Sequence, residues 1–69
     1  MLHKYYVNNS AQQNGDHEVH EEHCTYLKMA HDVEYLGMFE NGIQAVAYAR
    51  KIYAKADGCY FCCKEAHTS

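Results

Sequence analysis

Large apolar side chains are scarce in this chain of 69 residues. It has no Trp and no Pro, and only three Leu, two Ile and two Phe, so much of its 48% apolar content is Ala and Tyr. A chain of this length buries only about 60% of its unfolded surface, and its core supplies no more than about 3–5 kcal/mol. Residues 1–69 therefore form one small domain, which we expect to depend on a further link such as a disulfide or a metal ion.

Long apolar segments are also missing. No run approaches the ~20 residues that span a bilayer, so we expect no membrane partner. The first residues contain no apolar segment of the signal-peptide type, which predicts a cytoplasmic protein. In the cytoplasm thiols stay reduced, and clustered cysteines indicate a metal more often than a disulfide.

Basic residues are few, and the formal net charge is −3. Proteins that bind nucleic acid through its phosphates need clustered Lys and Arg. The small group of basic residues between positions 50 and 55 is explained by the last turn of a helix. Nucleic-acid binding stays possible but is not favoured, although four tyrosines are candidates for a stacking platform. These are Tyr5, Tyr6, Tyr26 and Tyr35.

Three segments have the composition of β-strands. Residues 3–8, 17–20 and 33–39 are rich in β-branched or aromatic types, and a polar loop ending in an Asn-Gly turn separates the first two. Gly37 interrupts the third segment and suggests a bulge there. These segments predict a small antiparallel sheet of about three strands.

One helix is predicted from about residue 42 to residue 56. Asn41 is a favourable N-cap, with Gln44 in the position of a capping box. Apolar residues then recur at helical spacing, and Gly58 suits the position just past the helix end. The predicted fold class is α+β, with the sheet packed on this one main helix and a zinc knuckle at the C-terminal end.

Two groups of metal ligands lie near opposite ends of the chain. His20 and Cys24 form a His-x3-Cys pair, and Cys59 and Cys62 form a Cys-x2-Cys pair. Zinc is commonly bound by four Cys and His ligands, two from each of two such pairs. The pairs predict a site without an open coordination position, which is structural rather than catalytic.

The ligand register leaves alternatives open. Cys63 can replace Cys62, because Cys59-x3-Cys63 is also a workable spacing, and His67 can replace His20. If Cys62 is the ligand, Cys63 is expected to be a small buried apolar residue. The remaining histidines are expected to be solvated on the surface. They are His3, His17, His23 and His31.

A disulfide, a redox pair and a Cys–His dyad are each less favoured than a metal site. A disulfide from Cys24 to a C-terminal cysteine is feasible only in an exported protein. A redox Cys-x2-Cys pair opens a long helix, whereas this pair follows the only long one predicted. A Cys24–His dyad lacks an oxyanion-forming loop, and the acidic run of Glu18, Glu21 and Glu22 suits a solvated surface. We therefore expect no catalytic residues and no enzymatic activity.

A family resemblance covers roughly residues 5 to 63. The run from His20 to Leu27, the strand ending in Phe39, the Ala-rich helix and the Gly-Cys-Tyr-Phe-Cys run resemble the small zinc domain of the Ada DNA-repair methyltransferase family. The chain also resembles short bacterial proteins ending in Gly-Cys-Tyr-x-Cys-Cys, which bring no known activity. The resemblance implies an α+β fold and zinc ligands at His20, Cys24, Cys59 and Cys62. In the Ada domain a cysteine at the first ligand position accepts a methyl group, and His20 here cannot do so.

The sequence thus predicts a monomeric zinc domain with a structural site, acting as a binding or scaffolding module for an unknown partner. The alternative is a thiol-reactive or DNA-alkylation-related protein that uses a metal-bound cysteine, with Cys24, Cys62 or Cys63 as the reactive residue.

Overall fold

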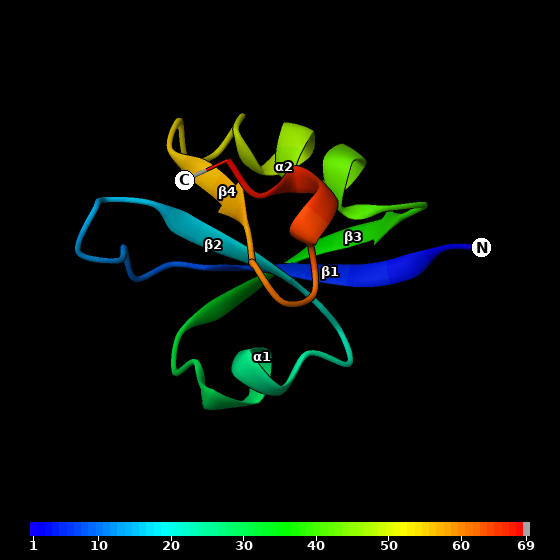
Figure 1. Ribbon diagram of the computed structural model, residues 1–69, viewed down its shortest axis with the longest axis horizontal. Helices are drawn as coiled ribbons and strands as arrows, with labels where there is room; N and C mark the ends of the chain where they lie inside the picture. The colour runs from blue at the N-terminus through cyan, green and yellow to red at the C-terminus, as the bar shows by residue number, and fades with distance from the viewer. Residues whose placement is uncertain (69) are drawn as a thin grey trace.

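A four-stranded mixed sheet forms the centre of the structure, a computed structural model that describes residues 1–68 (Figure 1). The strand order is β3-β1-β2-β4. β1 pairs with β2 and with β3 in antiparallel fashion, whereas β4 is parallel to β2. The elements are β1 (His3–Asn8), β2 (His17–Glu21), α1 (Thr25–Met29), β3 (Val33–Phe39), α2 (Gly42–Ala49), β4 (Ala56–Gly58) and the 3₁₀ turn η1 (Lys64–Ala66).

The three strands expected from the sequence are all present, but the expected strand count was too low. The fourth strand, β4, consists of Ala56, Asp57 and Gly58, all buried. None of these residue types favours a strand. β4 forms because its pairing with His17–Val19 of β2 places it in the sheet, so its existence depends on a contact that is distant in sequence.

Helix α2 begins where the sequence predicted and ends earlier. The Asn41 side chain accepts a hydrogen bond from the Gln44 amide at 3.0 Å, as an N-cap does. The helix ends at Ala49 and not at residue 56, so the predicted C-terminal half is wrong. The chain leaves the helix in turns and enters β4, and the ring of Tyr53 stacks on His17 with centroids 3.7 Å apart. This stacking holds the segment after the helix against the start of β2.

Gly58 does not follow a helix end, as the sequence suggested, but lies in β4. A Cβ atom at this position would lie only 2.6 Å from the backbone oxygen of Cys63. Glycine is therefore required by the close approach of two backbone segments rather than by a helix terminus.

The core lies between the sheet and α2, and it is as thin as the composition implied. Its larger members are Tyr5, Val7, Val19, Leu36 and Val46, and the helix contributes mostly alanine. Of the few Leu, Ile and Phe residues, only Leu36 is buried. Such a core contributes little to the free energy of unfolding, so other interactions must supply much of the stability.

A β-bulge bends β3 at the predicted glycine. Tyr5 is opposite Gly37 and Tyr6 is opposite Tyr35, so Leu36 is the extra residue. Gly37 has a φ of +129°, a backbone conformation that other residues rarely adopt. The bulge predicted near Gly37 is confirmed.

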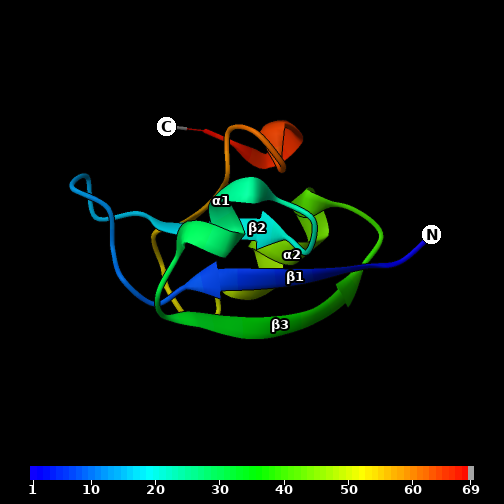
Figure 2. The same cartoon turned by 90° about the horizontal axis from the view of Figure 1, so that it is seen from below.

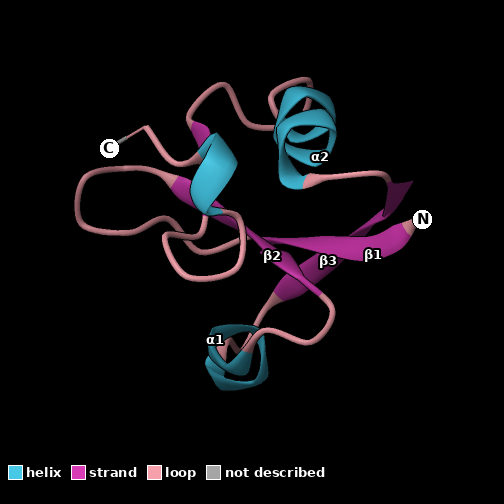
Figure 3. Ribbon diagram, turned by 45° about the vertical axis from the view of Figure 1, so that its right-hand side comes forward, coloured by secondary structure: helices cyan, strands magenta, loops and turns pink. Residues whose placement is uncertain are grey.

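A second, short helix lies on the side of the sheet away from α2 (Figures 2 and 3). This helix, α1, buries none of its five residues. The sheet is thus not packed on a single helix, as expected, but has α2 on one side and α1 on the other. No helix in residues 1–68 is long and apolar enough to cross a membrane.

Candidate metal centre

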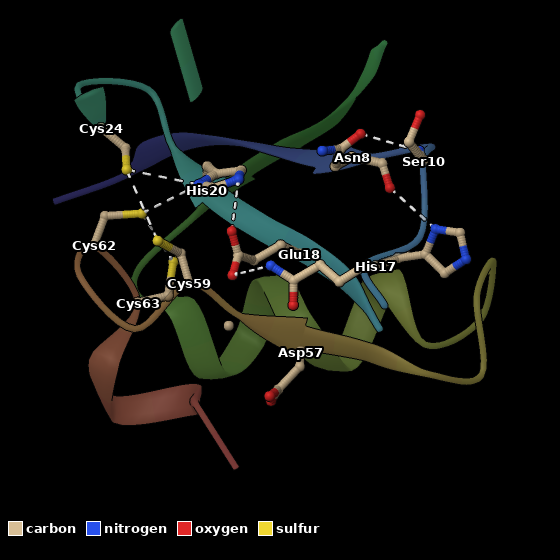
Figure 4. Close-up of polar contacts among 12 residues, drawn as sticks. Asn8, Ser10, His17, Glu18, His20, Cys24, Asp57, Cys59, Cys62 and Cys63 are labelled. Carbon is tan, nitrogen blue, oxygen red and sulfur yellow. Dashed lines mark hydrogen bonds and ion pairs between the residues drawn. The ribbon is translucent and has the colours of Figure 1, made fainter. Parts of the chain in front are cut away.

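Four side chains from the two predicted ligand pairs converge in the structure. His20 lies in β2, Cys24 precedes α1, Cys59 follows β4, and Cys62 lies in the next turn. One potential ligand atom from each residue lies within 4.8 Å of all the others, and Figure 4 shows the imidazole and the three sulfur atoms facing one another. The arrangement is a His/Cys3 cluster that can hold a metal ion.

The separations between the donor atoms suit a tetrahedral ion. Zn–S bonds of about 2.3 Å and Zn–N bonds of about 2.0–2.1 Å place tetrahedral donors roughly 3.5–3.8 Å apart. The Nδ1 atom of His20 lies 3.6 Å from the Cys24 sulfur and 3.9 Å from the Cys62 sulfur. The sulfurs of Cys24 and Cys59 are 4.0 Å apart. Only a small contraction would bring these atoms to bonding positions around one ion.

Tight turns present the cysteines. The amide of Cys24 donates to the Glu21 carbonyl, and the amide of Cys63 donates to the Cys59 carbonyl, so one turn ends at Cys24 and the other contains Cys59 and Cys62. The Glu21 amide donates to the Cys62 sulfur at 3.3 Å. These turns therefore orient the three sulfurs without a bound metal, and an N–H group directed at a sulfur favours its thiolate form.

The site is buried. His20 is 2% exposed, Cys24 6% and Cys59 1%, and Cys62 is half-buried. Burial raises the pKa of the Cys24 thiol, and it raises that of Cys59 to about 12, although nearby backbone amides oppose the rise. The pKa of Cys62 is raised first by its hydrogen bond with Cys63 and then by burial. Without a cation these thiols keep their protons near neutral pH.

The histidine is also held neutral. Burial lowers the pKa of His20, and the carboxylate of Glu18 partly opposes this effect. A neutral imidazole is the form that binds metals. A divalent cation would supply the positive charge that allows the buried thiols to ionise, so the donor set fits such an ion both in geometry and in charge.

The reserve ligands lie outside this cluster of four. Cys63 is fully buried in the core, and its sulfur is 3.9 Å from that of Cys62. The Nδ1 atom of His67 lies 2.9 Å from the Gly58 carbonyl oxygen and 3.5 Å from the Asp57 carboxylate. Neither belongs to the group whose donor atoms meet. All four cysteines are free thiols.

His17 differs from the solvated histidine that was expected. It is half-buried, stacked on Tyr53, and its Nδ1 atom lies 3.1 Å from the Asn8 carbonyl oxygen. Its ring packs β2 against the segment after α2. No local pattern in the sequence predicts this contact.

Glu18 is the residue of the site that sequence reasoning missed. It was assigned to a solvated acidic run, but one of its carboxylate oxygens lies 3.3 Å from Nε2 of His20. The two residues are two positions apart in β2, and residues at this spacing share one face of a strand. The alternation of side chains along a strand could therefore have predicted that Glu18 and His20 share a face.

No family model, curated protein or solved structure matches the chain.

Proposed function

We propose that this protein is a small zinc domain in which one ion, bound by His20, Cys24, Cys59 and Cys62, links the two halves of the chain. The observation that carries the proposal is the convergence of these four donors from two distant segments to within 4.8 Å. Three thiolates and one imidazole are a common ligand set of structural zinc. Binding of such an ion contributes about 10–16 kcal/mol in small zinc domains, far more than this core supplies.

The proposed role of the ion is structural, and the protein is proposed not to be an enzyme. Catalytic zinc sites keep one position for water or substrate, whereas four protein ligands complete a tetrahedron. The burial of the donors supports this choice, since a reacting molecule needs access. The resemblance to the Ada zinc domain supports the same ligand set without its methyl transfer, because His20 stands at the accepting position.

The cellular role that we propose is a binding or scaffolding module, and exposed aromatic side chains beside the site support it. Tyr26, Tyr60 and Phe61 are 42%, 51% and 66% exposed. Tyr26 lies two residues after Cys24, and Tyr60 and Phe61 lie between Cys59 and Cys62. Exposed aromatic rings are typical of interaction surfaces.

The proposal is tested by metal stoichiometry in two matched cysteine variants. Native mass spectrometry of the freshly purified protein should find one zinc ion per chain. Cys59→Ser should lose the ion, while Cys63→Ser, which changes an equally buried cysteine outside the cluster, should keep it. A metal-free wild-type protein that stays folded and carries one unusually reactive thiol would instead favour the thiol-reactive alternative.

A further inference from the structure

The ring of His20 has its two nitrogen atoms directed at different groups. Nδ1 faces the sulfurs of Cys24 and Cys62 at 3.6 and 3.9 Å. Nε2 lies on the far side of the ring, 3.3 Å from the Glu18 carboxylate (Figure 4). The side chain is buried, so it cannot easily turn over, and each nitrogen has a separate role. Nδ1 is placed to bind the metal, and Nε2 is placed to carry the proton.

Glu18 is itself anchored from the loop before β2. Its second carboxylate oxygen accepts a hydrogen bond of 2.8 Å from the side-chain amide of Gln12. Gln12 is held in the loop by two backbone hydrogen bonds, to Asp16 and from Gly15, each of 2.8 Å. A continuous chain of contacts therefore runs from the loop through Glu18 to the imidazole.

We propose that Glu18 is the positioning residue of the metal site and that it fixes His20 as an Nδ1 ligand. The inference rests on the proposed function. A carboxylate near Nε2–H selects one tautomer, orients the ring and increases the electron density at the other nitrogen. Loss of such an outer partner typically lowers metal affinity by about 10- to 100-fold. Gln12 and Glu18 thus connect the loop to the ring that is placed to bind the metal.

The first test is metal affinity, measured with Zn²⁺ by competition with a chromophoric chelator at one pH. Glu18→Leu removes the carboxylate and should weaken zinc binding by about 10- to 100-fold. Glu18→Gln keeps an oxygen acceptor and should recover part of that loss, and Gln12→Ala should give a smaller loss than Glu18→Leu. Glu34→Gln is the control, because it removes the same charge from an exposed residue of β3. Equal affinities for wild type and Glu18→Leu would overturn the proposal.

The second test is spectroscopic and does not depend on stability. Nitrogen-15 NMR of the zinc-loaded protein, through two-bond correlations of the His20 ring, should show zinc at Nδ1 and a proton at Nε2. Zinc at Nε2 would overturn the inference while leaving the proposed zinc domain intact. A wild-type protein that binds no zinc would overturn the proposed function. This outcome is distinguishable from binding of zinc at Nε2. In the affinity test, the variants are compared after loading with saturating zinc, and far-UV circular dichroism checks that each loaded variant is folded.

Discussion

At the scale of single residues, the main feature is a set of buried groups that carry no charge until a metal arrives. Burial raises the pKa of Cys24 and Cys59 and lowers the pKa of His20. The thiols are therefore protonated and the imidazole is neutral at pH 7. Metal binding must expel protons from the thiols and none from the histidine.

Zinc binding at pH 7 should thus release about three protons per ion, one from each of the three ligand cysteines. Isothermal titration calorimetry in buffers of different ionisation enthalpy measures this number. About two protons would mean that one cysteine of the cluster is not a ligand, and Cys63→Ser should leave the number unchanged.

The same groups set the direction of the pH dependence. Because protons compete with zinc for the thiolates, affinity should fall steeply as the pH is lowered. Burial of His20 acts in the same direction: the stability that its lowered pKa gives to the folded state is present above about pH 6.5 and is lost as the pH falls through the folded-state pKa.

At the scale of elements, β4 and the turn after it connect the sheet to the C-terminal ligand pair. Gly58 ends β4, and the next residue is Cys59 of the His/Cys3 cluster. The space around Gly58 is closed by the backbone of Cys63 and Ala66. A side chain there must push the C-terminal turn away from the sheet.

Gly58→Ala should lower stability by about 1–3 kcal/mol, because backbone atoms cannot move aside as a flexible side chain would. It should also weaken zinc binding, since the turn that it displaces carries two ligands. Chemical denaturation and chelator competition measure the two effects. Asn41→Ala is the matched control: loss of the α2 cap should cost about 1 kcal/mol, with zinc affinity unchanged. Equal zinc affinity in Gly58→Ala would contradict the argument.

At the scale of the whole molecule, the His/Cys3 cluster brings the start of α1 and the turn after β4 together. The helix α1 buries no residue, and its Tyr26 stacks on Phe61 with ring centroids 4.6 Å apart. Tyr26 lies two residues after the first ligand pair, and Phe61 lies between the two cysteines of the second pair. Their contact therefore depends on the two pairs being held together.

Removal of the metal should abolish this stack and most of the tertiary structure, because a thin core supplies less than the ion does. Near-ultraviolet circular dichroism, followed while a chelator is added, should lose its aromatic signal, and zinc should restore it. Phe61→Ala is the control: it removes the stack but should retain zinc and far-ultraviolet dichroism. A metal-free protein with an unchanged aromatic signal would contradict the structural role.

Much of the site was predictable because its information is local. The ligand types, the short spacers within each pair and the Asn41 cap depend on residues only a few positions apart, and the strand segments depend on composition. The place where α2 ends was not predictable, because residues 50–56 continue an apolar helical pattern. The packing of Tyr53 on His17 and the pairing of β4 with β2 outweigh that preference.

The sequence by itself therefore determined which side chains could bind a metal, the approximate strands and the start of the main helix. Only the tertiary structure decided that Cys62 rather than Cys63 joins the cluster, that His67 turns to Gly58 and Asp57, and that Glu18 faces His20. The physical reason is that spacing fixes which donors share a turn, whereas the choice among neighbouring donors depends on how the sheet directs two distant turns toward each other.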